Sequence, residues 1–138
     1  GHATGDEALV LFARTGGAIL REHDILGRMG GEEFALAMPG TDLEGALQAA
    51  ERLREATMEI ALLSCGGSYQ MTVSIGLVVI DANEDLPAAL ARADRALYEA
   101  KRNGRNRVEL GGAARRAGRT APPPLRAGPA RACRPPCR

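Results

Sequence analysis

The stretch RMGGEEFALAM, residues 28–38, decides the fold of this chain. It places two glycines and two carboxylates between short runs of apolar residues. Glycine reaches positive φ at little cost, so Gly30-Gly31 predicts the turn of a β-hairpin. The flanking strands are expected at Ile25–Met29 and Glu33–Met38, the second with alternating apolar side chains. A pair of acids is therefore predicted at the edge of a sheet.

One helix is predicted before this hairpin and another after it. The first runs from Asp6 to about Arg21, because acids at its start suit the positive end of the helix dipole. The second begins at Thr41, which forms a capping box with Glu44, and ends near Met58. Its inner face is expected to comprise apolar residues at helical spacing: Leu43, Leu47, Ala50 and Leu53.

A turn at Gly66–Ser68 and a long strand are predicted next. Apolar residues dominate Gln70–Ile80, which is typical of a strand buried on both faces. Asp85 is expected to cap a last helix that ends at Asn103-Gly104, followed by an edge strand at Val108–Leu110. The inward side chains of that helix are expected to be Leu86, Leu90, Ala93, Leu97 and Ala100.

The composition changes sharply near residue 111. Residues 111–138 contain seven arginines, six prolines and no acid, whereas the first 110 residues carry 11 basic and 17 acidic side chains. Such a segment cannot bury a core, so we expect one domain at 1–110 and a disordered tail at 111–138. A basic arm could neutralise nucleic-acid phosphates, but the tail lacks aromatic side chains that stack on bases. We therefore expect no nucleic-acid partner.

No feature of the sequence indicates a membrane-spanning segment. No apolar run approaches the roughly 20 residues that cross a bilayer. No charged-then-apolar leader opens the chain either. The expected location is the cytoplasm, with any membrane anchor lying upstream in a longer parent protein.

The paired acids allow two interpretations from their spacing alone. Mg²⁺ prefers hard oxygen ligands and is usually held by one or two carboxylates together with substrate phosphates. Glu32 and Glu33 could form such a site, with Gly30 and Gly31 leaving room for a phosphate. They could equally be polar turn residues without a ligand.

Four segments in register resemble the GGDEF, or diguanylate cyclase, family. They are GHATGD (1–6), GGEEF (30–34), TVSIG (72–76) and ADRALYEAKRNGRN (93–106). The resemblance spans nearly all of residues 1–110. It implies a palm-like α/β (α+β) domain with a central, mostly antiparallel sheet flanked by helices. It also implies that two GTP molecules become cyclic di-GMP and two pyrophosphates, with one GTP on each subunit of a homodimer.

The resemblance implies catalytic roles for the hairpin. Glu32 would bind the metal ion, Mg²⁺ or Mn²⁺. Glu33 would assist the metal site or deprotonate the attacking 3′-hydroxyl. Gly30 and Gly31 would let the phosphates approach.

Three further residues correspond to substrate contacts of the family. Asp6 would accept hydrogen bonds from guanine, unless it is only a helix cap. Lys101 and Arg105 would hold the terminal phosphates of GTP. Cations also stabilise the C-terminal end of a helix, and both roles are compatible.

The segment REHD resembles the family's RxxD inhibitory site, where the cyclic di-GMP product binds and stops the enzyme. Arg21 would donate to phosphate or guanine, and Asp24 would accept from guanine. Arg52, which lies off the apolar face of its helix, matches a secondary contact or is a solvated surface residue. A chain with this site could also be a non-catalytic GTP or cyclic di-GMP sensor.

The resemblance begins after the family's first strand and helix. That segment supplies the family with a metal-binding Asp, a phosphate-binding Lys and a guanine-binding Asn. We therefore expect this chain alone to be poorly stable and to have little or no cyclase activity. A fragment without function is the third interpretation.

Overall fold

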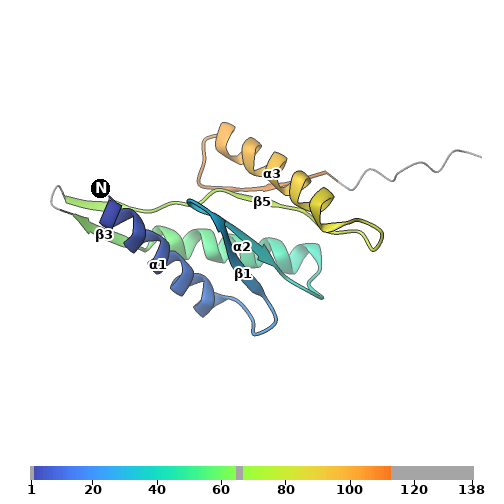
Figure 1. The fold of residues 1–138 in the computed structure, drawn as a ribbon, viewed down its shortest axis with the longest axis horizontal. Helices are drawn as coiled ribbons and strands as arrows, with labels where there is room; N and C mark the ends of the chain where they lie inside the picture. The colour runs from blue at the N-terminus through green and yellow to red at the C-terminus, as the bar shows by residue number, and fades with distance from the viewer. Residues whose placement is uncertain (1, 65–66, 113–138) are drawn as a thin grey trace, which may run out of the picture.

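The structure, a computed structural model, describes residues 2–64 and 67–112 as a mixed α/β unit (Figure 1). None of the helices among these residues is long and apolar enough to cross a membrane. In chain order the elements are α1 (His2–Ile19), β1 (Ile25–Gly30), β2 (Glu33–Ala37), α2 (Leu43–Met58), β3 (Ala61–Ser64), β4 (Gly67–Gln70), β5 (Ile75–Leu77), α3 (Leu86–Arg102) and β6 (Val108–Leu110).

The predicted hairpin is confirmed. β1 pairs with β2 in antiparallel register, from Ile25 opposite Ala37 to Arg28 opposite Phe34. The register then shifts, so that Gly30 lies opposite Glu33. A bulge of this kind bends the strand and re-aims side chains near the turn.

Helix α1 packs against this hairpin. The ring of Phe12, which is 7% exposed, lies 4.9 Å from the ring of Phe34 at an angle of 57°. A Cβ at Gly16 would lie only 2.6 Å from Leu26 Cδ2, so the absence of a side chain allows close approach of helix and strand. The predicted helix limits are wrong, because α1 begins at His2 and Asp6 lies within its second turn.

Helix α2 begins one residue later than the capping-box pattern predicts. Its N-cap is Asp42, whose Oδ1 accepts a hydrogen bond of 2.8 Å from the Gly45 backbone N–H. The prediction of a Thr41–Glu44 box is therefore wrong, while the end at Met58 is confirmed. Leu43 is exposed, and the buried face comprises Ala46, Ala49, Ala50, Leu53 and Thr57.

The long strand predicted at Gln70–Ile80 is wrong. β4 ends at Gln70 in an antiparallel pair with β3, and the three residues of β5 pair in parallel with β6. The described residues thus form three two-stranded ladders instead of one continuous sheet. The apolar pattern is that of a buried strand, but a ladder also needs hydrogen-bonding partners. Of the predicted turn, Gly67 and Ser68 belong to β4 and Gly66 lies outside the described residues.

The ends of α3 are confirmed, but its inward face is the predicted one only in part, since Ala100 is buried and the two leucines at the start of the helix are not. Asp85 caps the helix by accepting from Ala88 N–H, and Asn103 is the C-cap. Leu86 and Leu90 are exposed by 62% and 38%, and the buried residues are Ala89, Arg92, Ala96 and Ala100. Small side chains face β5 because the two backbones approach closely; a Cβ at Gly76 would lie 2.2 Å from the Ala93 carbonyl oxygen.

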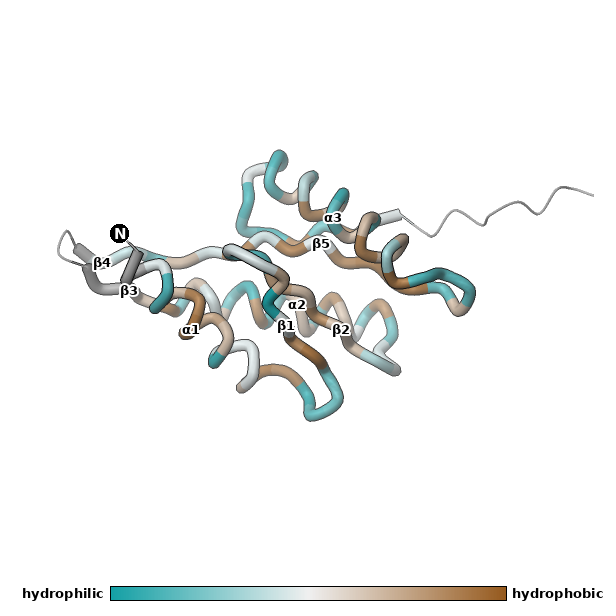
Figure 2. Tube along the Cα trace, viewed as in Figure 1, coloured by the Kyte–Doolittle hydropathy of each residue, from teal (hydrophilic) through white to brown (hydrophobic). Residues whose placement is uncertain are grey.

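The core lies between α2, β5 and α3. Ala46, Ala50 and Leu77 are its buried centre, with Met38 and Val108 among the residues packed around it. Figure 2 shows the hydrophobic positions following β5, whereas the loops at both ends of α3 are hydrophilic. Those polar loops are therefore available for contacts with ligands.

The chain beyond β6 stays attached for two residues. Gly111 N–H donates to the Leu77 carbonyl at 2.7 Å, and the Gly112 carbonyl accepts from Arg92. These two glycines therefore pack on the folded part, although the sequence predicts that the tail begins at residue 111. The remainder of the expected tail, 113–138, lies outside the described residues.

Candidate active site

The tip of the β1–β2 hairpin presents the paired acids to solvent. Glu32 and Glu33 are both exposed, and neither carboxylate has a hydrogen-bond or ion-pair partner within the described ranges 2–64 and 67–112. Gly31 has φ of +54°, a left-handed conformation that favours glycine. A Cβ at Gly30 or Gly31 would meet nothing within 4 Å, so the tip is open on its outer side.

Arg28 stabilises this turn through hydrogen bonds that the sequence does not predict. Its Nε and Nη2 donate to the Gly31 carbonyl oxygen at 2.9 and 2.7 Å. Two donors on one carbonyl restrict the peptide that leads into Glu32. The signal in the sequence was an Arg three residues before a left-handed Gly, which is too general to identify the contact in advance.

The donor set at the tip suits a divalent cation. Carboxylate oxygens are the ligands that Mg²⁺ prefers, and one or two of them suffice when substrate phosphates complete the shell. The described residues contain no cluster of three or more Asp, Glu, His or Cys side chains that could hold a metal ion by themselves. The two exposed glutamates thus fit a metal that shares its ligands with a nucleotide.

Asp6 is exposed on α1, and its position relative to the hairpin follows from the Phe12–Phe34 contact. Asp6 precedes Phe12 by six helical positions, which is about 9 Å along the helix axis at 1.5 Å per residue. The carboxylate is not at the helix end, so its expected alternative role as a cap is wrong.

Lys101 and Arg105 lie at the C-terminal end of α3 and are both exposed. Arg105 has φ of +60° and its backbone N–H donates to the Ala100 carbonyl at 2.9 Å. Lys101 and Arg105 thus supply two exposed positive side chains at the end of α3, and such side chains suit phosphate oxygens.

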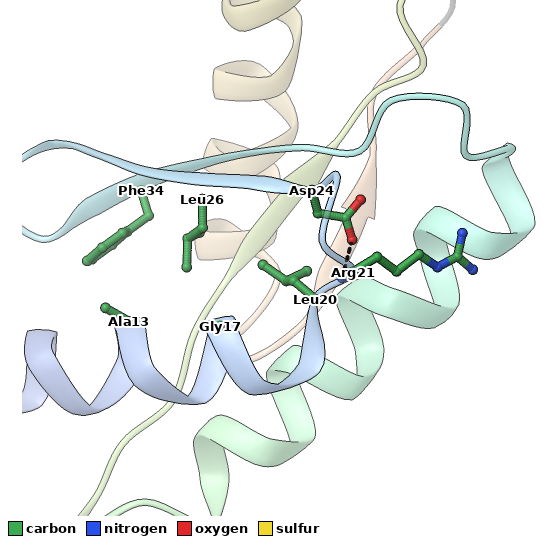
Figure 3. A pocket seen from close by; sticks show the side chains of 7 residues that line it. All are labelled: Ala13, Gly17, Leu20, Arg21, Asp24, Leu26 and Phe34. Carbon is green, nitrogen blue, oxygen red and sulfur yellow. Dashed lines mark hydrogen bonds between the residues drawn. The ribbon is translucent and has the colours of Figure 1, made fainter.

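The REHD segment forms a closed turn after α1. Asp24 Oδ2 accepts from Arg21 N–H at 2.9 Å, and Asp24 N–H donates to the Arg21 carbonyl at 3.0 Å. Figure 3 shows the Asp24 carboxylate directed at the Arg21 backbone while the Arg21 side chain extends away from it. The guanidinium is thus presented outward by a turn that does not depend on the side chain of Arg21.

A pocket of about 300 Å³ adjoins this turn. It is lined by Ala13, Gly17, Leu20, Arg21, Asp24, Leu26 and Phe34 (Figure 3). Two of the three residues predicted for product binding therefore share one pocket with an apolar floor. Arg52 is exposed on α2 and does not line it.

A buried ion pair stabilises the segment before α3. Arg92 donates to both Glu84 carboxylate oxygens, at 2.7 and 2.5 Å, and also to the Val79 carbonyl at 2.6 Å. The hydrogen bonds from Arg92 hold the pKa of Glu84 below its ordinary value of 4.5, despite the opposing effect of burial. Neither Arg92 nor Glu84 is expected in the interior from the sequence, because charged side chains are seldom buried unless they are paired.

This chain is similar in sequence to known proteins over most of its length. Residues 1–107 match the family model described as "Diguanylate cyclase, GGDEF domain". The diguanylate cyclase DgcM of Escherichia coli K12 is 44% identical over 108 residues, which are 78% of this chain and 26% of that protein. The chain thus spans about a quarter of the length of this relative.

Solved structures share the fold. Diguanylate cyclase SiaD of Pseudomonas aeruginosa, in complex with its activator SiaC, has a TM-score of 0.77 at 38% identity, covering 80% of this chain and 43% of that one. The GGDEF domain of DgcB from Caulobacter crescentus, in complex with c-di-GMP, has a TM-score of 0.75 at 32% identity, covering 80% and 66%. These likenesses confirm the expected palm-like α/β architecture.

Proposed function

The chain belongs to the GGDEF family of diguanylate cyclases, and we propose that it carries the half-site that condenses two GTP molecules into cyclic di-GMP and two pyrophosphates. The observation that carries this proposal is the open hairpin tip, where Glu32 and Glu33 are exposed beside the left-handed Gly31. The match of residues 1–107 to the diguanylate cyclase family model favours this proposal over the alternative that the hairpin tip is a polar turn without a ligand.

Each step of the reaction conserves atoms and charge. The 3′-hydroxyl of one GTP attacks the α-phosphorus of the other, a new P–O bond forms, and the bond from that phosphorus to the α–β bridging oxygen breaks to release one pyrophosphate. A second attack of the same kind, by the 3′-hydroxyl of the other nucleotide, closes the ring and releases the second pyrophosphate. The hydroxyl proton passes to a base. Glu33 serves as that base or supports the metal site, and two antiparallel copies of the chain each hold one GTP.

The residues of this chain bind and orient the substrate. Glu32 would hold Mg²⁺ or Mn²⁺, which when bound neutralises charge on the phosphate oxygens. Lys101 and Arg105 donate to the terminal phosphates, and Asp6 accepts from the guanine edge. Holding the phosphates on one edge aligns the attacked phosphorus and lowers the entropic part of the barrier.

Turnover of GTP tests the proposal. The protein is incubated with GTP and Mg²⁺, and cyclic di-GMP is measured by chromatography. We expect Glu32→Gln to lower the rate at least 100-fold, while Glu59→Gln, an exposed control on the far end of α2, leaves it unchanged. Turnover indifferent to Glu32→Gln overturns the proposal.

A second candidate is a cyclic di-GMP sensor, favoured by the Arg21–Asp24 turn beside its pocket. Calorimetry with cyclic di-GMP separates the candidates, because a sensor binds the product without forming it. Binding that Arg21→Ala abolishes, in a protein without turnover, supports the sensor. Binding together with turnover supports a cyclase that its product inhibits.

A further inference from the structure

The loop after α3 has an unusual backbone. Gly104, Arg105 and Asn106 have φ of +113°, +60° and +45° in succession. Of the two that are not glycine, Asn adopts a left-handed conformation readily, whereas this conformation costs a residue such as Arg105 about 1–2 kcal/mol. Surrounding contacts must therefore hold the loop in this shape.

Asn106 makes those contacts. Its Oδ1 accepts from Arg54 Nη1 at 3.3 Å, and its Nδ2 lies 3.3 Å from Met58 Sδ, so the side chain attaches the loop to α2. Its backbone N–H donates to Ser74 Oγ at 3.2 Å, which attaches the same residue to the segment before β5.

Arg54 is itself held in place. Its Nε forms an ion pair with Glu51 Oε2 at 2.7 Å, its Nη1 also contacts Met58 Sδ at 3.2 Å, and its side chain is only 18% exposed. The support beneath Asn106 is therefore ordered, and α2 acts as the fixed base of the loop.

Arg105 has the opposite surroundings. Throughout residues 2–64 and 67–112 no hydrogen bond or ion pair engages its guanidinium or the ammonium of Lys101. The direction of the Arg105 side chain thus depends on the backbone, which is held by the bond from Arg105 N–H to the Ala100 carbonyl and by the contacts of Asn106.

We propose that Asn106 is a positioning residue that holds Arg105 in the left-handed conformation required to bind the terminal phosphates of GTP. This inference rests on the proposed function, because it takes the phosphate-binding role of Arg105 from there. The proposed role of Asn106 does not require it to contact the substrate. It acts through the backbone of its neighbour.

Affinity for nucleotides with and without phosphates tests the inference. The probes are guanosine and a GTP analogue whose α–β bridge is a methylene group, which cannot react. We expect Asn106→Ala to weaken binding of the analogue about tenfold, as the loss of a charge-assisted contact does, and to leave guanosine binding unchanged. A purely structural role would weaken both probes together.

Further variants make the test specific. Asn106→Gly keeps access to positive φ but loses the side-chain contacts, so we expect an intermediate effect. Asn103→Ala is the control, since that C-cap side chain donates to Glu109 Oε1 in β6 at 3.0 Å and, among the described residues, makes no hydrogen bond to α2 or to Arg105. In Asn106→Ala, the second substitution Arg105→Ala is expected to add less than twofold, because both act on one contact.

The outcomes separate this inference from the proposed function. Analogue binding that Arg105→Ala weakens and Asn106→Ala does not overturns the inference alone, as does full additivity of the two substitutions. A wild-type protein that binds no analogue overturns the proposed function and this inference with it. If Asn106→Ala fails to fold by circular dichroism, Arg54→Met provides the same comparison, because it removes the support from outside the loop.

Discussion

Glycine at position 31 is required by its backbone conformation, since φ is +54° and a Cβ there would meet open space within the chain. The positive φ from which the sequence predicts this turn is therefore confirmed at Gly31. A side chain at position 31 would also obstruct an incoming phosphate. This effect on ligand binding can be separated by experiment from the effect on the backbone conformation.

Two substitutions at this residue separate the causes. We expect Gly31→Ala to lower the free energy of unfolding by about 1 kcal/mol, and Gly31→Asn by less, because Asn tolerates positive φ. Both should lower GTP turnover, since both place a side chain where phosphate approaches. Urea unfolding and cyclic di-GMP formation measure the two effects, and full turnover in Gly31→Asn would show that only conformation matters.

At the residue scale, the sequence correctly predicted the hairpin turn and the paired acids at its tip, while the binding role of the REHD segment stays a prediction. It could not predict the contacts that hold them, because Arg28 and Asn106 act through particular distances in the folded chain. An Arg or Asn in a loop has many possible partners. Only packing of the surrounding elements selects one.

At the scale of elements, α3 shows why a helical pattern can misplace its inward face. Leucines at 86 and 90 outrank alanines in hydrophobicity, yet α3 lies so close to Gly76 that small residues face β5. Arg92 then becomes buried, because Glu84 and two backbone carbonyls satisfy its guanidinium. The short distance between the backbones of α3 and β5 determines which face of α3 is buried. The pattern of apolar residues in the sequence does not reveal that distance.

The Arg92–Glu84 pair predicts an acid-dependent loss of stability. The pKa of Glu84 is lowered in the folded state, so its contribution is present above the ordinary value of 4.5 and disappears as pH falls through the folded value. We expect the difference in unfolding free energy between wild type and Glu84→Gln to shrink between about pH 5 and pH 3. Urea unfolding at several pH values measures it, with exposed Glu59→Gln as control. A difference that does not vary with pH would contradict the role of this ion pair.

At the scale of the whole molecule, the described part of the chain has a thin core. Its buried apolar side chains are mostly alanine, with Phe12, Leu53 and Leu77 the larger exceptions, while Val79 and Ile80 are about half exposed. Strand β5 has one hydrogen-bonded neighbour among the described residues. Burial of apolar surface is the main stabilising term, so we expect an unfolding free energy near or below about 5 kcal/mol, the low end for domains.

Such a marginal molecule should respond strongly to ligand, which gives a test of the product site. Any ligand that binds only the folded state stabilises it by mass action, by about 2.7 kcal/mol at 100 times its dissociation constant. We expect cyclic di-GMP to stabilise the wild-type chain by this amount in urea unfolding. We expect Arg21→Ala to remove the effect while the turn itself persists, because Asp24 bonds the backbone of residue 21 and not its side chain.

The matched control is Arg14→Ala, an exposed arginine on α1 that does not line the pocket. It removes the same charge from the same helical region, so it corrects for general electrostatic attraction of a dianionic ligand. Stabilisation retained in Arg14→Ala and lost in Arg21→Ala assigns the ligand to the Arg21–Asp24 turn. Equal loss in both would mean that cyclic di-GMP responds to net charge, and equal retention would locate its binding elsewhere on the molecule.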